Sequence, residues 1–137
     1  MPRLIVSAVT VLVFVIGCDR APSDRALKRD FPRLKANMVA AVPNLTPLHP
    51  RHPNLSHRVV PANLGADIES IQERGSLVLF QVCVHSFAGS GVASGYAYSP
   101  GGALGNVVPN ASAAVANADA MFLAHIEGGW YVYKHGF

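Results

Sequence analysis

The chain has few of the residues from which catalytic and metal sites are built. Its 137 residues include two cysteines and eight acidic residues, and only 14% of all residues are charged. The motifs HExxH and GxSxG, a Walker loop and a glycine-rich dinucleotide turn are all missing from the sequence. Without a partnered nucleophile, a metal set or a cofactor motif, no reaction class is indicated. We therefore expect a protein that is not an enzyme and that uses no cofactor.

Long apolar runs are also scarce. The one such run extends from Leu4 to Gly17 and contains 14 uncharged residues. A helix that spans a bilayer needs roughly 20 apolar residues, so this run is too short to span but has the length of a signal-peptide core. A buried core helix is the alternative, but Pro22 follows closely and the pattern does not continue. We expect residues 1–17 to be a cleaved signal peptide.

The end of this run is more specific. Val15-Ile16-Gly17-Cys18 resembles the lipobox of bacterial lipoproteins, in which aliphatic and small residues precede a cysteine. The resemblance implies cleavage between Gly17 and Cys18 and attachment of diacylglycerol to the Cys18 sulfur. Cleavage before an unmodified cysteine is the alternative, but no A-x-A-like site is present. The acylated Cys18 would hold the domain in the cell envelope, on the extracytoplasmic side, and Asp19 favours the inner membrane in some lineages.

Basic residues are concentrated near this predicted anchor. Residues 19–58 contain eight basic and three acidic residues, whereas residues 59–137 contain two basic and five acidic ones. Anionic head groups attract basic side chains near a membrane surface. We therefore expect membrane lipid as a partner, and no nucleic acid because no recognition motif is present.

Cys83 is the second cysteine. With Cys18 acylated, it would have no partner for an intramolecular disulfide. Its apolar surroundings predict an inert buried thiol, although His85 would point to the same face of a strand and leaves a Cys-His pair open.

Two helices are predicted in the first half of the mature chain. Ser23 can cap a helix over residues 24–41, which has one apolar stripe and a weak point near Phe31 because Pro32 removes a backbone hydrogen bond. Leu64, Ile68 and Ile71 predict a second, short helix over residues 65–74, with Gly75 as its stop.

Residues 42–61 contain five prolines, which predict a linker or an irregular loop. Histidine is a common metal ligand, so three residues of this loop are candidate ligands: His49, His52 and His57. A Pro-rich loop, however, does not hold such side chains in a fixed geometry.

The remaining sequence predicts strands. Residues 76–87 and 92–99 are β-branched and aromatic, and residues 121–127 and 130–137 flank Gly128-Gly129, a hairpin signal. The predicted fold is α+β, with two N-terminal helices packed on an antiparallel sheet of about four strands. The predicted segments are a signal peptide (1–17), a lipidated N-terminus with the amphipathic helix (18–41), a Pro/His-rich loop (42–61) and a small α+β domain (62–137).

Two further motifs extend the resemblance. "SGYAYSP" at residues 94–100 and "HIEGGWYVY" at residues 125–133, together with the lipobox and the helix start "PSDRAL", resemble a group of short uncharacterised bacterial lipoproteins. The Pro/His loop, Pro32 and Ser94 depart from that group's pattern. The resemblance implies an envelope location and this fold, but no activity.

The aromatic residues of these motifs are the predicted binding surface: Tyr96, Tyr98, Trp130, Tyr131 and Tyr133. Alternation places the two tyrosines of each strand on one face. Exposed, they would anchor an envelope protein or a glycan; buried, they would only stabilise the sheet. We expect a small non-catalytic binding or assembly module. The alternatives are a structural or accessory lipoprotein, and a metal-binding protein that uses the histidine loop.

Overall fold

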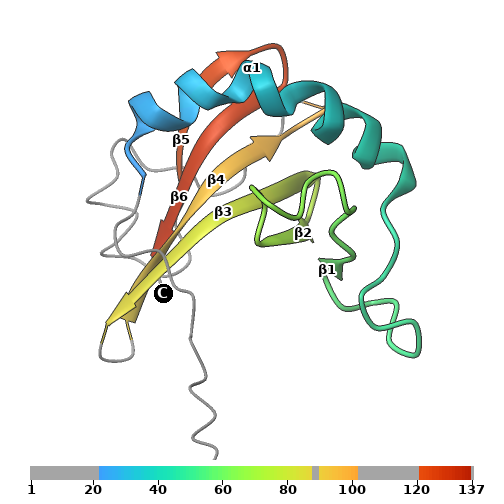
Figure 1. Ribbon diagram of the computed structural model, residues 1–137. Coiled ribbons are helices and arrows are strands. Elements are labelled where there is room, and N and C mark those ends of the chain that lie inside the picture. Colours follow the sequence, from blue (N-terminus) through green and yellow to red (C-terminus); the bar gives the residue numbers. More distant parts are fainter. Residues whose placement is uncertain (1–21, 88–89, 102–120, 137) are drawn as a thin grey trace, which may run out of the picture.

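The computed structural model describes residues 22–87, 90–101 and 121–136, and consists mainly of one antiparallel sheet (Figure 1). Along the chain, helix α1 (Asp24–Ala41) and the short 3-10 helix η1 (Val42–Asn44) are followed by six strands. These are β1 (His57–Arg58), β2 (Ser70–Arg74), β3 (Leu77–Phe87), β4 (Ser90–Tyr98), β5 (Met121–Glu127) and β6 (Trp130–Gly136). The strand order in the sheet is β1-β2-β3-β4-β6-β5, and every neighbouring pair is antiparallel.

Helix α1 begins and ends where its sequence predicts. The Ser23 hydroxyl accepts a hydrogen bond from the amide of Ala26 at 3.1 Å and so caps the first turn. The helix continues through Pro32, which lies on the exposed side. In a regular helix the amide of residue 32 would donate a hydrogen bond to the Lys28 carbonyl, but proline has no amide hydrogen. Lys28 is also exposed. Water can therefore satisfy that carbonyl, and the predicted weak point does not interrupt the helix.

The expected architecture of two helices on four strands is wrong. Residues 65–74 do not form a helix: they comprise a turn and strand β2, which pairs with β3. Leu64, Ile68 and Ile71 are buried, as their spacing suggested, but they reach the core from a turn and a strand. Gly75 has a φ of 59°, and this conformation serves the tight β2–β3 hairpin instead of a helix end. β1 and β2 extend the sheet beyond four strands.

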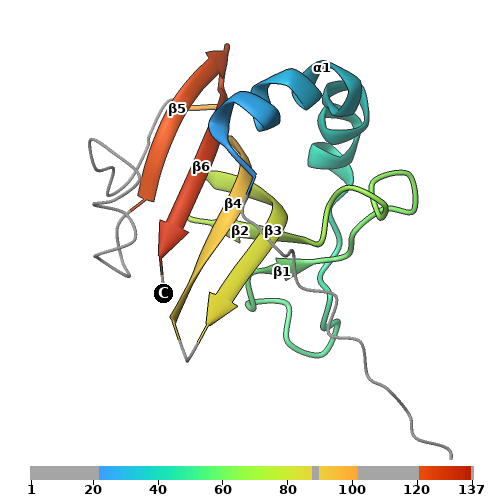
Figure 2. The same cartoon turned by 60° about the vertical axis from the view of Figure 1, so that its left-hand side comes forward.

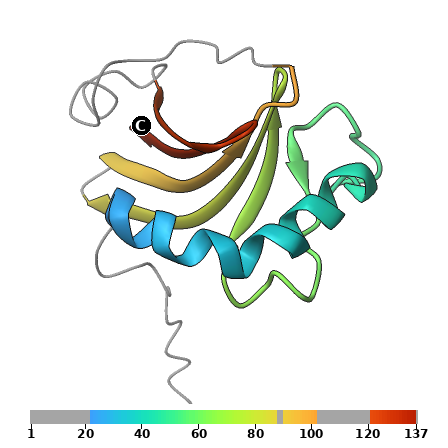
Figure 3. The same ribbon diagram turned by 90° about the horizontal axis from the view of Figure 1, so that it is seen from above.

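The main core lies between α1 and one face of the sheet. Figures 2 and 3 show α1 lying along one side of the curved strands. The buried stripe of the helix consists of Leu27, Phe31, Leu34, Met38 and Ala41. It packs on buried residues of the sheet and of the turn before β2, among them Leu64, Ile71, Phe80, Tyr96, Trp130 and Val132. A smaller apolar cluster covers the opposite face and includes Leu77, Leu79, Ala97 and Tyr133.

Candidate functional site

The five aromatic side chains of the predicted binding surface do not form one exposed patch. Tyr96 and Trp130 are 0% and 5% exposed and lie on the α1 face of the sheet, as does Tyr98. Tyr131 and Tyr133 lie on the opposite face, because alternation along β6 points them away from Trp130. The strands are neighbours, but their register divides the aromatic residues between two faces.

The rings on the α1 face hold the helix on the sheet. The ring centroid of Trp130 lies 5.5 Å from that of Phe31, 5.7 Å from that of Phe80 and 4.8 Å from that of Tyr98. The Tyr96 hydroxyl donates a hydrogen bond to the Leu27 carbonyl at 2.7 Å. Burial, reinforced by the charge of Asp30, raises the pKa of Tyr96 to about 12. These contacts stabilise the fold.

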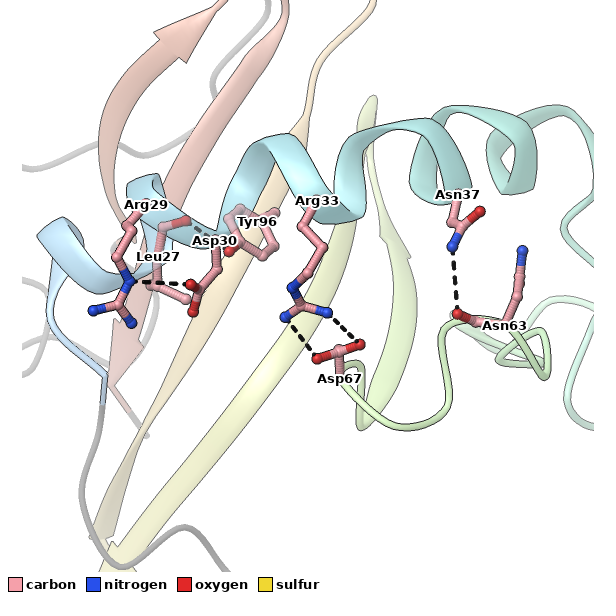
Figure 4. A network of polar contacts seen from close by, with 8 residues as sticks. All are labelled: Leu27, Arg29, Asp30, Arg33, Asn37, Asn63, Asp67 and Tyr96. Atoms are coloured by element: carbon pink, nitrogen blue, oxygen red, sulfur yellow. Dashed lines mark hydrogen bonds and ion pairs between the residues drawn. The ribbon is translucent and has the colours of Figure 1, made fainter.

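Polar contacts fix the outer side of α1 to the turn that precedes β2 (Figure 4). Arg33 donates two hydrogen bonds to the Asp67 carboxylate, at 2.9 and 3.1 Å. The hydrogen bonds from Arg33 hold the pKa of Asp67 below its usual value, while partial burial opposes this effect. The Asn37 amide contacts the Asn63 carbonyl at 3.5 Å. Helix α1 is thus held on the sheet by its buried apolar stripe and on the turn before β2 by these exposed polar contacts.

The three loop histidines lie on the surface. His49, His52 and His57 are all exposed, and the His57 ring contacts the Gln72 amide at 3.1 Å. Within residues 22–87, 90–101 and 121–136, no group of three or more histidine, cysteine or acidic side chains is placed to hold a metal ion.

Cys83 differs from its prediction. Its side chain is 1% exposed, as expected for a core position, but its sulfur is bonded in a disulfide and is not a free thiol. The expectation of an unpaired thiol is therefore wrong, and a Cys-His nucleophile with His85 is excluded in this state. The chain contains one other cysteine, Cys18, which lies outside the described residues together with Gly17 and the rest of the predicted signal peptide.

A cavity of about 320 Å³ lies on the sheet face opposite α1. It forms because β4 contributes only small residues there, Ala93, Gly95 and Ala97, while the strands on both sides contribute large ones. Gly95 has no space for a side chain, since an added Cβ would overlap the Phe80 carbonyl oxygen. The hollow over β4 is thus a consequence of the alternating small residues and of the register. Its lining consists of Gln72, Arg74, Leu79, Gln81, Val84, Ala93, Tyr133 and His135.

The lining combines apolar walls with hydrogen-bonding groups. Leu79 and Ala93 are 5% and 8% exposed, and Val84 is half-buried beside them. Tyr133 is 2% exposed, and burial raises the pKa of its hydroxyl strongly, an effect that Arg74 partly offsets and Glu69 reinforces. The hydroxyl therefore stays protonated at any physiological pH and can donate a hydrogen bond.

Of this lining, the sequence singled out only Tyr133, as a member of the predicted aromatic surface. The other polar residues come from three strands, and each is unremarkable in its own segment. The available signal was the alternation of Ala93, Gly95 and Ala97, which predicts a strand with one face almost free of side chains.

Among the described residues, no helix is both long and apolar enough to cross a membrane. Comparisons with protein-family models, with curated proteins and with solved structures found no match to this chain. The resemblance to short bacterial lipoproteins therefore stays a prediction from the sequence.

Proposed function

We propose that this chain is a membrane-anchored lipoprotein of the bacterial cell envelope and that its folded domain is a non-catalytic binding module. The observation that carries the anchor is the 14-residue apolar run that ends in Val15-Ile16-Gly17-Cys18. Acyl chains on Cys18 would each contribute about 0.8 kcal/mol per buried CH₂, so two or more chains would hold the protein stably at the membrane.

The position of α1 supports this arrangement. The described chain begins at Pro22, four residues after Cys18, and four extended residues span at most about 14 Å. The start of α1 would therefore stay close to the head groups. Arg25, Lys28 and Arg29 are exposed in the first two turns, where anionic lipids would attract them.

The binding role rests on the cavity over β4 and no longer on an exposed aromatic patch. Burial of Tyr96 and Trp130 assigns these two rings to packing, which is what a purely structural lipoprotein would need, whereas the buried Tyr133 also lines the cavity. A cavity with apolar walls and several converging polar groups is typical of a ligand site. This cavity favours a binding module over the accessory alternative.

The disulfide at Cys83 supplies a competing interpretation of Cys18. A sulfur that carries diacylglycerol cannot also form a disulfide, so an anchored chain needs a Cys83 that is not bonded to Cys18. Both states require export, because disulfides persist in oxidising compartments such as the periplasm. They differ in the mass and the membrane retention of the mature protein.

The test compares the parent with Cys18→Ala and with the matched control Cys83→Ala. Membranes are washed with high salt and carbonate, and the intact mass of each retained and released protein is measured. We expect the parent and Cys83→Ala to be retained with added diacylglycerol mass and Cys18→Ala to be released. A released parent that lacks lipid mass, and that gains two alkylated thiols only after reduction, would overturn the anchor.

A further inference from the structure

We propose that the cavity over β4 binds a small apolar carboxylate, with Arg74 engaging the carboxylate and the walls of the cavity engaging the apolar body. This inference rests on the proposed binding function and names its ligand class. It does not depend on the lipid anchor.

Arg74 gives the cavity its charge. Among the described residues of the lining, it is the only lysine, arginine or acidic residue. Arg58, Arg33 and Arg29 pair with acidic side chains, but Arg74 takes part in no ion pair among the described residues. An arginine without a partner beside a concave surface suits a carboxylate, which its planar fork can bind through two parallel hydrogen bonds.

The neighbouring polar groups can complete the coordination of a carboxylate. Gln72 lies two residues before Arg74 on β2, so both side chains point to the cavity face. Gln81 lies on the adjacent strand, and its amide offers N–H donors. The Gln72 amide nitrogen contacts the His57 ring at 3.1 Å and carries a second N–H that can donate. Tyr133 lines the same cavity, and its hydroxyl remains protonated because burial raises its pKa. These groups would replace the hydration that a carboxylate loses on binding.

The walls determine what the rest of the ligand is. Leu79, Val84 and Ala93 form an apolar surface next to the polar groups. The volume of about 320 Å³ is near the lower end for ligand sites, so a single ring or a short aliphatic chain fits. A phosphate dianion would meet only one permanent cation here and would gain nothing from the apolar walls. The charge of Glu69 reaches Tyr133, whose pKa it raises, and it would also disfavour a second negative charge on the ligand.

The experiment uses two probes that differ in charge but hardly in shape, benzoate and benzamide. Each is titrated into the purified mature protein, and the dissociation constant is followed by the amide shifts of ¹H-¹⁵N spectra, including the side-chain amides of Gln72 and Gln81. Hydrogen bonds to a charged group predict that benzoate binds about tenfold more tightly or better. Arg74→Gln should remove this preference, because it leaves no lysine or arginine among the described residues of the lining.

Two variants complete the design. Arg51→Gln removes an exposed arginine of the proline-rich loop and should leave both affinities unchanged. Ala93→Leu places a larger side chain on the floor of the cavity and should weaken both probes. Equal affinity for benzoate and benzamide, no shifts at the glutamine amides, or a preference that survives Arg74→Gln would overturn the proposal. None of these results would alter the mass or the membrane retention of the parent, so the anchor is judged separately.

Discussion

Tyr96→Phe should change how the stability of this protein responds to alkaline pH. The Tyr96 side chain is fully buried, and its hydroxyl donates to the Leu27 carbonyl at 2.7 Å. At neutral pH the variant loses this hydrogen bond, which costs about 1 kcal/mol of unfolding free energy. The ring itself is retained, so its packing against Phe31 is unchanged.

The parent loses stability as the pH rises. In the folded protein the pKa of Tyr96 is about 12, whereas its ordinary value is 10.0. Between these values the unfolded chain releases the hydroxyl proton and the folded chain retains it, so the unfolded state gains stability. For a shift of this size the loss is about 1.4 kcal/mol at pH 11. Phenylalanine has no such proton, so the variant lacks this part of the loss.

The two effects have opposite signs, so the stability curves should cross. The parent is more stable at pH 7.5, and the advantage disappears at about pH 10.7, where the ionisation loss equals the contribution of the hydrogen bond. Urea unfolding from pH 7.5 to 11, followed by circular dichroism, measures this difference. Tyr133 and the lysines ionise equally in both proteins and cancel. A difference that stays constant over this pH range would refute the burial of the Tyr96 hydroxyl.

Two other predictions concern the sheet and the outer side of α1. Gly95→Ala should prevent normal folding, because the added Cβ has no space against β3. In the control Gly101→Ala, the added Cβ meets no atom within 4 Å, so the thermal midpoint should be unchanged. Similar thermal midpoints for both variants would contradict the tight contact at Gly95. Asp67→Asn should lower stability slightly at pH 7 and not at pH 2, because the lowered pKa of Asp67 beside Arg33 stabilises the fold only above that pKa. Urea midpoints at both pH values measure this, and an equal effect at both would be inconsistent with the ion pair.

Local signals predicted the elements that depend on local physics. The cap at Ser23 and the apolar stripe determine α1 without reference to the rest of the chain. The hairpin at Gly128-Gly129 is likewise determined by a turn, in which Gly128 has a φ of 51°. For residues 65–74 the same local reasoning failed. Three buried positions at helical spacing are also compatible with a turn that leads into a strand, and pairing with β3 decided between them.

The cavity and the aromatic packing depend on register, which single segments do not reveal. Tyr96 pairs with Val132, and only Tyr98 faces an aromatic residue of β6, Trp130, so the five aromatic residues do not form one patch. Arg74 and His135 are far apart in the sequence and line one cavity only because β2, β3, β4 and β6 lie in that order. The small residues of β4 are visible in the sequence, but that they leave a cavity can be inferred only when the neighbouring strands and their register are known.

The start of the described chain and the proposed cavity lie on opposite sides of the sheet, and in an anchored protein this would restrict the ligand. Lys134 donates a hydrogen bond to the Pro22 carbonyl at 3.2 Å, which holds the start of the described chain on the α1 face. With Cys18 in the membrane and the basic residues of α1 facing the head groups, the sheet would separate the cavity from the bilayer. The ligand would then arrive from the aqueous side. A short carboxylate that is soluble in water fits this access, whereas a long acyl chain that remains in the bilayer would not reach Arg74.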